Sequence, residues 1–318
     1  MFMKREIVKD IDLTKIKTMK DLTSQMTSSG GYVAKKVGDG SQILENMVKD
    51  KDCKRILSFP ASLVATGTRG IIKELVKRKI FDMIITTTGT LDHDIARIYR
   101  NYYHGSFEMD DKELHKEGIN REGNVLIPNE SYSEILEEKV REIIEKLYNK
   151  GLRDISTHEL IWEFGKSLED EKNKEDSIVY WCYKNKIPMI LPGPLDGSWG
   201  WQLYYFWQDG HKDFNLNIMK DEDAISDFIY SSDKTGALMI GGGISKHHTI
   251  WWNQFRGGLD YAVYITTAPE WDGSLSGARI REAVSWGKVR EDAEFITLEG
   301  DATVILPIMI GSLLESLK

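Results

Sequence analysis

Short apolar runs alternate with amphipathic stretches along the chain. Residues 55–59 and 82–87 predict buried strands, and residues 67–76 and 92–97, which follow them, predict helices. Continuous apolar runs of this length, bounded by Gly, Pro, Thr or Asp, are typical of parallel strands covered on both faces. Further strands of this kind are expected at residues 188–191, 237–240 and 261–265. The alternation predicts an α/β protein with a doubly wound, mostly parallel sheet and helices on both faces.

One long helix is clear from its periodicity, over residues 133–150. Its apolar residues form a single stripe, Ser131 with Glu134 fits a capping box, and Gly151 supplies the stop. The most charged stretch of the chain, residues 167–176, predicts a surface connection and not a domain boundary.

The composition gives no reason to divide the chain, so we expect a single domain over residues 1–318, with N-terminal helical decoration over residues 1–50. The 42 Lys and Arg against 50 Asp and Glu give a net charge of −8, which argues against a nucleic-acid surface. Two cysteines, Cys53 and Cys182, are too few for a disulfide framework or a four-thiolate zinc site, and no metal is expected. Residues 1–10 lack an apolar signal segment and no apolar run could span a membrane, so we expect a cytoplasmic protein.

The loops after the predicted strands are polar and rich in glycine. Ligands of doubly wound sheets bind beyond the carboxyl ends of the strands, so these loops define the candidate site. The loops are residues 60–67, 86–94, 192–198, 241–248 and 266–274. The glycines at 241–243 would let a ligand approach the backbone and open a helix whose N–H groups favour anions, although a structural turn uses glycines too. The usual GxGxxG dinucleotide fingerprint is absent.

Several side chains in these loops admit both a structural and a chemical interpretation. His247 and His248 lie about 100° apart on a helix, so they form no chelating pair, but one of them could act as a base. The acids at loop or helix-start positions each fit a helix cap or a solvated charge, and only their convergence would bind a polyamine or ribose hydroxyls. These acids are Asp92, Asp94, Asp196, Glu270, Asp272, Glu282 and Asp301.

Lys288 follows Trp286 and Gly287 in an apolar setting. A solvated lysine is the ordinary interpretation of such a residue. A desolvated lysine would instead present a free amine, a nucleophile that forms imines. The residues alone leave both interpretations open.

Four longer motifs resemble deoxyhypusine synthase. They are residues 241–248 (GGGISKHH), 260–268 (DYAVYITTA), 272–279 (DGSLSGAR) and 282–288 (EAVSWGK). Shorter matches at residues 86–89 (TTTG), 124–129 (NVLIPN) and 196–198 (DGS) extend the likeness, which covers roughly residues 20–315.

The resemblance implies a Rossmann-like single domain that assembles as a homotetramer with sites at dimer interfaces. It implies a transferase of hypusine biosynthesis, a post-translational modification. In that reaction NAD oxidises the secondary amine of spermidine to an imine, a lysine attacks, and 1,3-diaminopropane leaves. The aminobutyl group then passes from the enzyme lysine to one lysine of the translation initiation factor five-A precursor, and the retained NADH reduces the product. The implied cofactor is therefore NAD, and the implied partners are spermidine or a related polyamine and the precursor.

The family's functional residues carry over by position. The resemblance implies that Lys288 is the covalent lysine and His247 the base. The implied amine-binding residues are Glu282, Trp286, Asp272, Asp92 and His93. The implied NAD-binding residues are Ser62, Thr87, Thr88, Gly89, Asp196, Gly242, Gly243, Thr267, Ala268, Ser276 and Asp301.

The amine pocket departs from the family's pattern at four positions. Trp201 and Leu275 stand where acids are common, Trp251 replaces an asparagine, and His93 stands in place of a glutamate. Each lost carboxylate removes a charge-assisted hydrogen bond of ~1.5–3 kcal/mol, and an added indole returns ~0.5–2 kcal/mol through cation–π contact. The sequence therefore leaves the amine donor and the acceptor open.

Two alternatives to spermidine-dependent transfer remain. One is a related aminobutyltransferase with another donor or acceptor, such as a homospermidine synthase or an agmatine-using enzyme. The other is a non-catalytic paralogue that regulates an active subunit. The retained Lys288, His247 and Glu282 argue against the second alternative.

Overall fold

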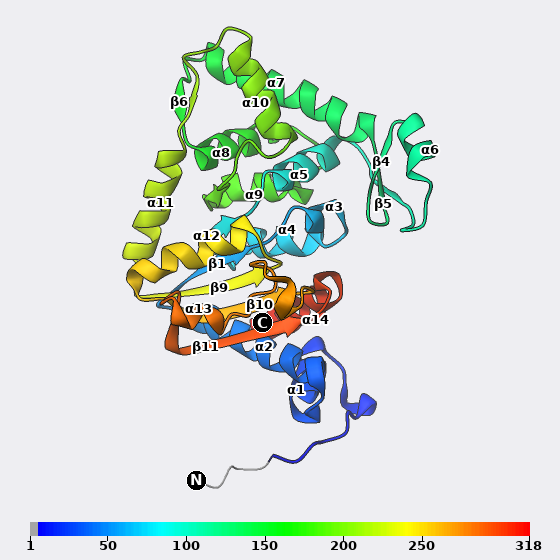
Figure 1. Cartoon of the computed structure of the whole chain (residues 1–318), viewed down its shortest axis with the longest axis vertical. Coiled ribbons are helices and arrows are strands. Elements are labelled where there is room, and N and C mark those ends of the chain that lie inside the picture. Colours follow the sequence, from blue (N-terminus) through cyan, green and yellow to red (C-terminus); the bar gives the residue numbers. More distant parts are fainter. Residues whose placement is uncertain (1–5) are drawn as a thin grey trace. The chain divides into compact units, whose positions relative to one another are not determined.

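The computed structural model describes residues 6–318, which fold into two compact units (Figure 1). Unit 1 combines the chain up to Ser58 with Ile229–Lys318, and unit 2 comprises Phe59–Phe228. Residues 1–5 lie outside the described residues. They include the start of the helical decoration expected over residues 1–50 and half of residues 1–10, where no signal segment was expected. The single domain expected over the whole chain stays a prediction.

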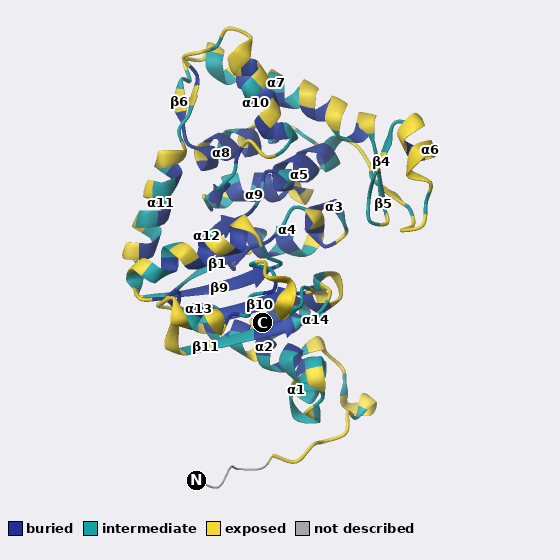
Figure 2. Ribbon diagram, in the orientation of Figure 1, coloured by how far each residue is buried: buried dark blue, intermediate teal, exposed yellow. Residues whose placement is uncertain are grey.

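Unit 1 is built on four parallel strands in the order β11-β10-β9-β1. Their bounds are β1 Cys53–Ser58, β9 Lys234–Ile240, β10 Leu259–Thr266 and β11 Val289–Glu299. Figure 2 shows β1, β9 and β10 as largely buried. Strands of this kind need cover on both faces, which explains their continuous apolar sequences.

The helices of unit 1 lie on both faces of these strands. They are α1 (Met19–Ser29), α2 (Tyr32–Lys49), α12 (Ile244–Asn253), α13 (Glu282–Ser285) and α14 (Ala302–Ser316), with 3-10 turns at Leu13–Lys15, Gln254–Arg256 and Glu270–Asp272.

Two neighbouring positions of β9 show which helix covers which face. The hydroxyl of Thr235 donates to Asn253 of α12 at 2.6 Å, whereas a Cβ on Gly236 would lie 2.5 Å from the sulfur of Met47 in α2. Consecutive strand residues point to opposite faces, so α2 and α12 cover opposite sides. The N-terminal helix α2 is therefore one of the layers that bury the sheet.

Unit 2 contains the parallel pair β2 (Met83–Ile85) and β7 (Met189–Ile190) and most of the helices. The helices are α3 (Ser62–Ala65), α4 (Arg69–Lys77), α5 (Gly89–Tyr99), α6 (Asp111–Lys116), α7 (Ser133–Asn149), α8 (Thr157–Ser167), α9 (Ile178–Asn185), α10 (Ser198–Gln208) and α11 (Ile218–Tyr230), with 3-10 turns at Asn129–Ser131 and Lys174–Asp176. Small sheets are formed by β3 (Tyr103–His104), β5 (Val125–Pro128) and β4 (Ile119–Glu122), which are antiparallel, and by β6 (Asp154–Ile155) with β8 (Asn215–Leu216), which are parallel.

The predicted α/β class, with parallel strands flanked by helices, is confirmed, and every predicted strand is present. The predicted capping box of α7 is wrong. Ser131 is buried in a 3-10 turn, and the helix begins at Ser133 after Tyr132, with no side-chain cap. Gly151, at φ +99°, does follow the end of this helix. In residues 6–318 no helix combines the length and the apolar character that crossing a bilayer requires.

Candidate active site

The glycine loop after β9 packs closely on one side and is open on the other. A Cβ on Gly242 would lie 2.1 Å from the hydroxyl of Ser276, so only glycine permits this approach. Gly243 has φ +79°, and a Cβ there would meet nothing within 4 Å. Tyr264 and Thr266 of β10 donate hydrogen bonds to the Ser276 carbonyl at 2.7 and 2.9 Å. The fold thus brings Gly242, Gly243 and Ser276 together.

This loop has the donors that a pyrophosphate needs. Helix α12 begins directly after Gly243, and the first N–H groups of a helix favour anions. Within residues 6–318, the buried hydroxyl of Ser245 in the first turn has no hydrogen-bond partner. Open backbone, a helix N-terminus and an unused hydroxyl fit the phosphates of NAD.

Three further predicted NAD residues of unit 1 lie after β10 and β11. The backbone N–H of Ala268 donates to Thr266, and the Ala268 carbonyl accepts from Arg279 at 2.9 Å, while Thr267 is exposed. Asp301 caps α14 by accepting the backbone N–H of Thr303 at 2.8 Å. The Asp301 carboxylate therefore serves as a helix cap in this structure, whether or not it also contacts NAD.

In unit 2, the predicted NAD residues gather where three strand-end loops meet. The hydroxyl of Thr87 accepts from the N–H of Ala61, next to Ser62, and the hydroxyl of Thr88 donates to the Gly193 carbonyl at 2.8 Å. A Cβ on Gly89 would lie 2.8 Å from that of Ala61. Asp196 lies in the third loop and is exposed, which suits a carboxylate that binds ribose hydroxyls.

A cavity of about 310 Å³ in unit 1 collects the predicted catalytic residues. Its lining consists of Lys246, His247, Ile250, Trp251, Leu275, Ala278, Arg279, Ile280, Glu282, Ala283, Trp286 and Lys288. The lining is mainly apolar, and among the described residues that form it Glu282 is the single carboxylate. A cavity of this size admits a small aliphatic amine.

Lys288 is almost buried in this cavity, with 8 % of its surface exposed. Its Nζ lies 5.1 Å from the centre of the Trp286 ring and 5.6 Å from that of Trp251. Gly287, at φ +65°, makes the turn that returns the chain from Trp286 to the start of β11 at Val289. Lys288 is therefore a largely buried lysine with aromatic neighbours.

His247 stacks on Trp251, with ring centres 5.8 Å apart and an angle of 22° between the planes. Desolvation lowers the pKa of His247, and the charge of Lys288 lowers it further. The ring therefore stays neutral to lower pH than an ordinary histidine, as a proton acceptor must.

Asp272 does not line the cavity. Its carboxylate accepts from the backbone N–H and the hydroxyl of Ser274, both at 2.8 Å, and closes its own turn. Leu275 and Trp251, the departures from the family's pattern in this unit, both line the cavity.

The other positions to which the resemblance assigned amine binding lie in unit 2. Asp92 is fully buried and accepts three hydrogen bonds, and burial raises its pKa to about 6. His93 is buried beside Tyr102, and desolvation lowers its pKa to about 4. Trp201 is half exposed on α10 and stacks on Tyr204.

Lys246 is a cavity residue to which the sequence analysis gave no role. Its side chain is 1 % exposed, and Nζ donates to the carbonyls of Leu275 and Ala278 at 2.8 and 2.7 Å. Burial lowers its pKa to about 7. The helical spacing of the sequence could have indicated its burial, because Lys246, Ile250 and Asn253 fall on one face of α12, and that face is buried.

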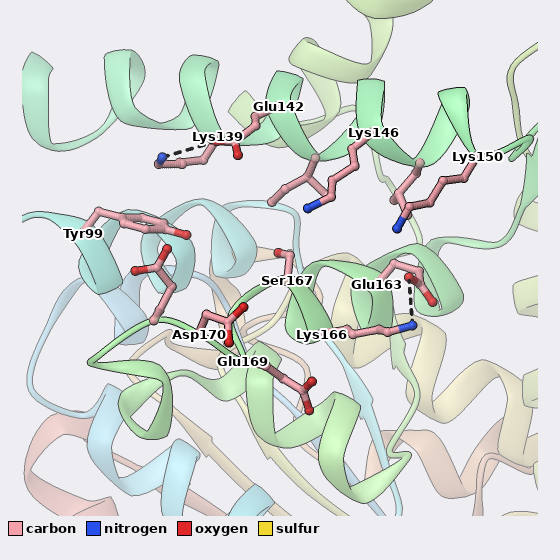
Figure 3. A pocket seen from close by; sticks show the side chains of 13 residues that line it. Tyr99, Lys139, Glu142, Lys146, Lys150, Glu163, Lys166, Ser167, Glu169 and Asp170 are labelled. Atoms are coloured by element: carbon pink, nitrogen blue, oxygen red, sulfur yellow. Dashed lines mark hydrogen bonds and ion pairs between the residues drawn. The ribbon is translucent and has the colours of Figure 1, made fainter.

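A second hollow, of about 280 Å³, lies in unit 2 between lysines of α7 and acids at the end of α8 (Figure 3). Lys146 of α7 and Lys150, directly after this helix, point into it, and Glu163, Glu169 and Asp170 lie opposite. None of the predicted site residues lines this charged groove.

Comparison with known proteins identifies the family. A sequence model described as deoxyhypusine synthase matches residues 21–313. Two proteins named as probable deoxyhypusine synthases are similar along their whole length: that of Picrophilus torridus is 55% identical over 311 residues, covering 98% of both chains, and that of Thermoplasma acidophilum is 54% identical over 307 residues, covering 96% of this chain and 97% of the relative. A crystal structure described as a deoxyhypusine synthase of Entamoeba histolytica superimposes with a TM-score of 0.65 over 98% of both chains, at 20% identity, and supports the fold alone.

The structure is that of a parallel α/β protein with a lysine-containing cavity beside a glycine loop. The chain belongs to the deoxyhypusine synthase family. Family membership makes it a transferase.

Proposed function

We propose that this protein transfers the aminobutyl group of spermidine to one lysine of the translation initiation factor five-A precursor, with NAD as cofactor. The observation that carries the proposal is the position of Lys288. This lysine is buried in a cavity that His247, Glu282 and Trp286 also line. A shielded amine, a neutral base and one carboxylate are the groups that imine formation on an enzyme lysine requires.

Candidate residues for NAD lie at strand ends of unit 1 and, taken separately, at strand ends of unit 2. Gly242, Gly243 and the N-terminus of α12 offer donors for the pyrophosphate, and Asp196 offers a carboxylate for a ribose. When bound, NAD would accept a hydride from the amine and return it at the end of the cycle.

Five of the residues that line the cavity have a part in the proposed chemistry. Glu282 would pair with the ammonium of the donor and so fix its position. His247 would remove a proton as the amine is oxidised, since its lowered pKa favours the neutral ring. The Lys288 amine would then attack the oxidised carbon, expel the diamine fragment and carry the four-carbon group. The indoles of Trp286 and Trp251 would exclude water from this adduct.

We further propose that the protein works in the cytoplasm as a homotetramer with its sites at dimer interfaces. The family resemblance supports this assembly. Light scattering on the purified protein should give about four times the mass of one chain, and a stable, active monomer would contradict the proposal.

One observation favours a second candidate, a related transferase with a donor other than spermidine. Among the described lining residues, Glu282 is the single carboxylate, whereas Lys246, Arg279 and Lys288 are basic. A donor with three ammonium groups finds little charge compensation from these residues, so a less charged amine, such as agmatine, is the alternative substrate.

The deciding experiment incubates the protein with NAD, isotope-labelled spermidine or agmatine, and the purified precursor. Mass spectrometry of both proteins after borohydride reduction should show label on Lys288 and on one precursor lysine. Label only from agmatine would establish the second candidate. Label on a free amine, with the precursor unmodified, would establish a homospermidine-synthase-like acceptor. Absence of label with either donor, under conditions where NAD binds, would refute both transferase proposals.

A further inference from the structure

Asp92 is a buried carboxylate that the proposed chemistry does not use. It lies in the first turn of α5 and is 0 % exposed. Its Oδ1 accepts the backbone N–H of Trp199 at 2.7 Å, and its Oδ2 accepts that of Ser198 at 2.9 Å. A carboxylate is buried at a large cost unless hydrogen bonds compensate it, so these bonds make its position specific.

The two N–H groups belong to the start of α10, which has no side-chain cap of its own. The preceding residue is Gly197, which has no side chain to accept them. A Cβ on Gly197 would lie 2.8 Å from Oδ2 of Asp92, so the glycine is what lets the carboxylate reach the helix. Asp92 therefore serves as the N-cap of a helix that begins more than a hundred residues later in the chain.

Two more contacts tie α5 and the segment that follows β5 to the same loop. The hydroxyl of Thr88 donates to the Gly193 carbonyl at 2.8 Å, at the other end of the loop. Tyr132 donates to Oδ2 of Asp92 at 2.9 Å and fixes the orientation of the carboxylate. Asp196 lies between the two points of attachment, so its position depends on them.

We propose that Asp92 is a positioning residue that holds the turn at residues 197–199, and with it Asp196, in the geometry that binds the cofactor. The inference rests on the proposed function, because the ligand of Asp196 is taken to be NAD. Asp92 is 0 % exposed and already accepts three hydrogen bonds within the protein, which favours a structural use of its carboxylate. This role replaces the amine-binding role that the resemblance implied for Asp92.

The test compares Asp92→Asn with Asp94→Asn in the full-length protein. The Asn oxygen can accept the backbone N–H of Trp199, but the Asn NH₂ group then faces the backbone N–H of Ser198, and two donors cannot form a hydrogen bond. Asp94 lies on the same helix and is equally buried, but it binds Arg69, Ser177 and Val179 instead. Three quantities are measured for each variant: amide hydrogen exchange of Ser198 and Trp199, the Kd for NAD, and KM and kcat with a saturating second substrate.

Asp92→Asn should speed the exchange of both amides and raise the Kd for NAD roughly tenfold, while KM for the amine stays unchanged. Asp94→Asn should lower the melting temperature without either effect. Tyr132→Phe, which keeps the carboxylate, should move exchange and Kd in the same direction by a smaller factor, and it serves as the test if Asp92→Asn does not fold.

Unchanged exchange, or unchanged NAD affinity with a raised KM for the amine, would overturn the inference. Failure of the proposed function looks different, because the unmodified protein would then bind no NAD. In that case the amide hydrogen exchange of Ser198 and Trp199 in Asp92→Asn still shows whether Asp92 holds the turn. If it does, but no ligand binding depends on the turn, the cofactor-positioning role is overturned.

Discussion

The Nζ of Lys288 lies 5.1 Å from the centre of the Trp286 ring, and the two residues differ sharply in exposure. Trp286 is 66 % exposed, whereas Lys288 is 8 % exposed. The centre of the Trp251 ring lies 5.6 Å from the same Nζ, so two indoles contribute to the cover of this lysine. An imine hydrolyses readily in water, so this cover would protect the proposed adduct until transfer.

Lys288→Arg should abolish the covalent adduct. The guanidinium keeps the charge and approximate length of the side chain, but it remains protonated and cannot form an imine. NAD binding should be unchanged, because no predicted NAD residue depends on this side chain. Borohydride trapping followed by peptide mass spectrometry measures the adduct. An adduct at Lys246, with Lys288→Arg retaining full transfer, would show that Lys246 is the reactive lysine.

Trp286→Ala should weaken amine binding and allow water to hydrolyse the adduct before the group is transferred. Loss of the proposed cation–π contact between Trp286 and the donor ammonium, ~0.5–2 kcal/mol, should raise KM for the amine by roughly 2- to 30-fold. Water should also reach Lys288, so more donor is cleaved per group transferred. The ratio of diamine released to acceptor modified measures this loss. The matched control is Trp271→Ala, because Trp271 is exposed in the same unit but does not line the cavity. Equal ratios in the two variants would refute the shielding role.

Gly242→Ala should damage the cofactor loop. The added methyl would lie 2.1 Å from Ser276, so the two segments must separate, at about 1–3 kcal/mol in stability. The Kd for NAD should rise at least tenfold, measured by calorimetry. Gly70→Ala is the control, because Gly70 lies in helix α4 and a Cβ there would meet nothing within 4 Å. This substitution should stabilise the protein by about 0.5–1 kcal/mol. Normal NAD affinity in Gly242→Ala would place the cofactor elsewhere.

The strands and the loops that follow them were predictable because both depend on local sequence. Residues 237–240 and 261–265 are continuous apolar runs, and the polar motifs begin where these runs end. Strand β11 was not predicted, since Arg290, Glu291 and Asp292 are consecutive exposed charges in this edge strand and interrupt its apolar pattern. A strand half covered by solvent lacks the continuous apolar signal of a central one.

The roles of single polar residues depended on distant contacts that the sequence does not display. Asp92 caps a helix that begins at Ser198, and Lys246 is satisfied by carbonyls at Leu275 and Ala278. Ser131 fits a capping box by spacing, yet the chain folds it into the preceding turn. The family resemblance therefore pointed to Lys288, His247, Glu282 and Trp286, which line the cavity, while tertiary packing decides which acids bind protein groups.

Leu275→Asp should change the preference among amine donors. Leu275 lines the cavity, where Glu282 is the single carboxylate among the described lining residues. A second carboxylate there should improve kcat/KM for a triamine relative to a less charged donor, by roughly tenfold or more, since a charge-assisted hydrogen bond contributes ~1.5–3 kcal/mol. Leu275→Asn has nearly the same shape without the charge and should give a much smaller change. An equal change in both variants would attribute the preference to shape alone.

The buried amine of Lys246 should make stability depend on pH. Burial lowers its pKa from 10.5 to about 7, with the Arg279 charge acting in the same direction and Glu282 opposing it. Between these values the unfolded chain binds a proton that the folded chain does not, so the free energy of unfolding rises with pH through this window. Below pH 7 both states are protonated and the full penalty applies.

Lys246→Met removes this titration while filling a similar volume. The unfolding free energy of the wild type minus that of Lys246→Met should therefore increase from pH 7 to pH 9, by roughly 1–3 kcal/mol, in urea unfolding at each pH. Lys17→Met, at an exposed position of unit 1, should leave the difference constant. A constant difference for Lys246→Met as well would mean that Lys246 keeps its proton in the folded protein. In that case the carbonyls of Leu275 and Ala278 would compensate the charge that burial penalises.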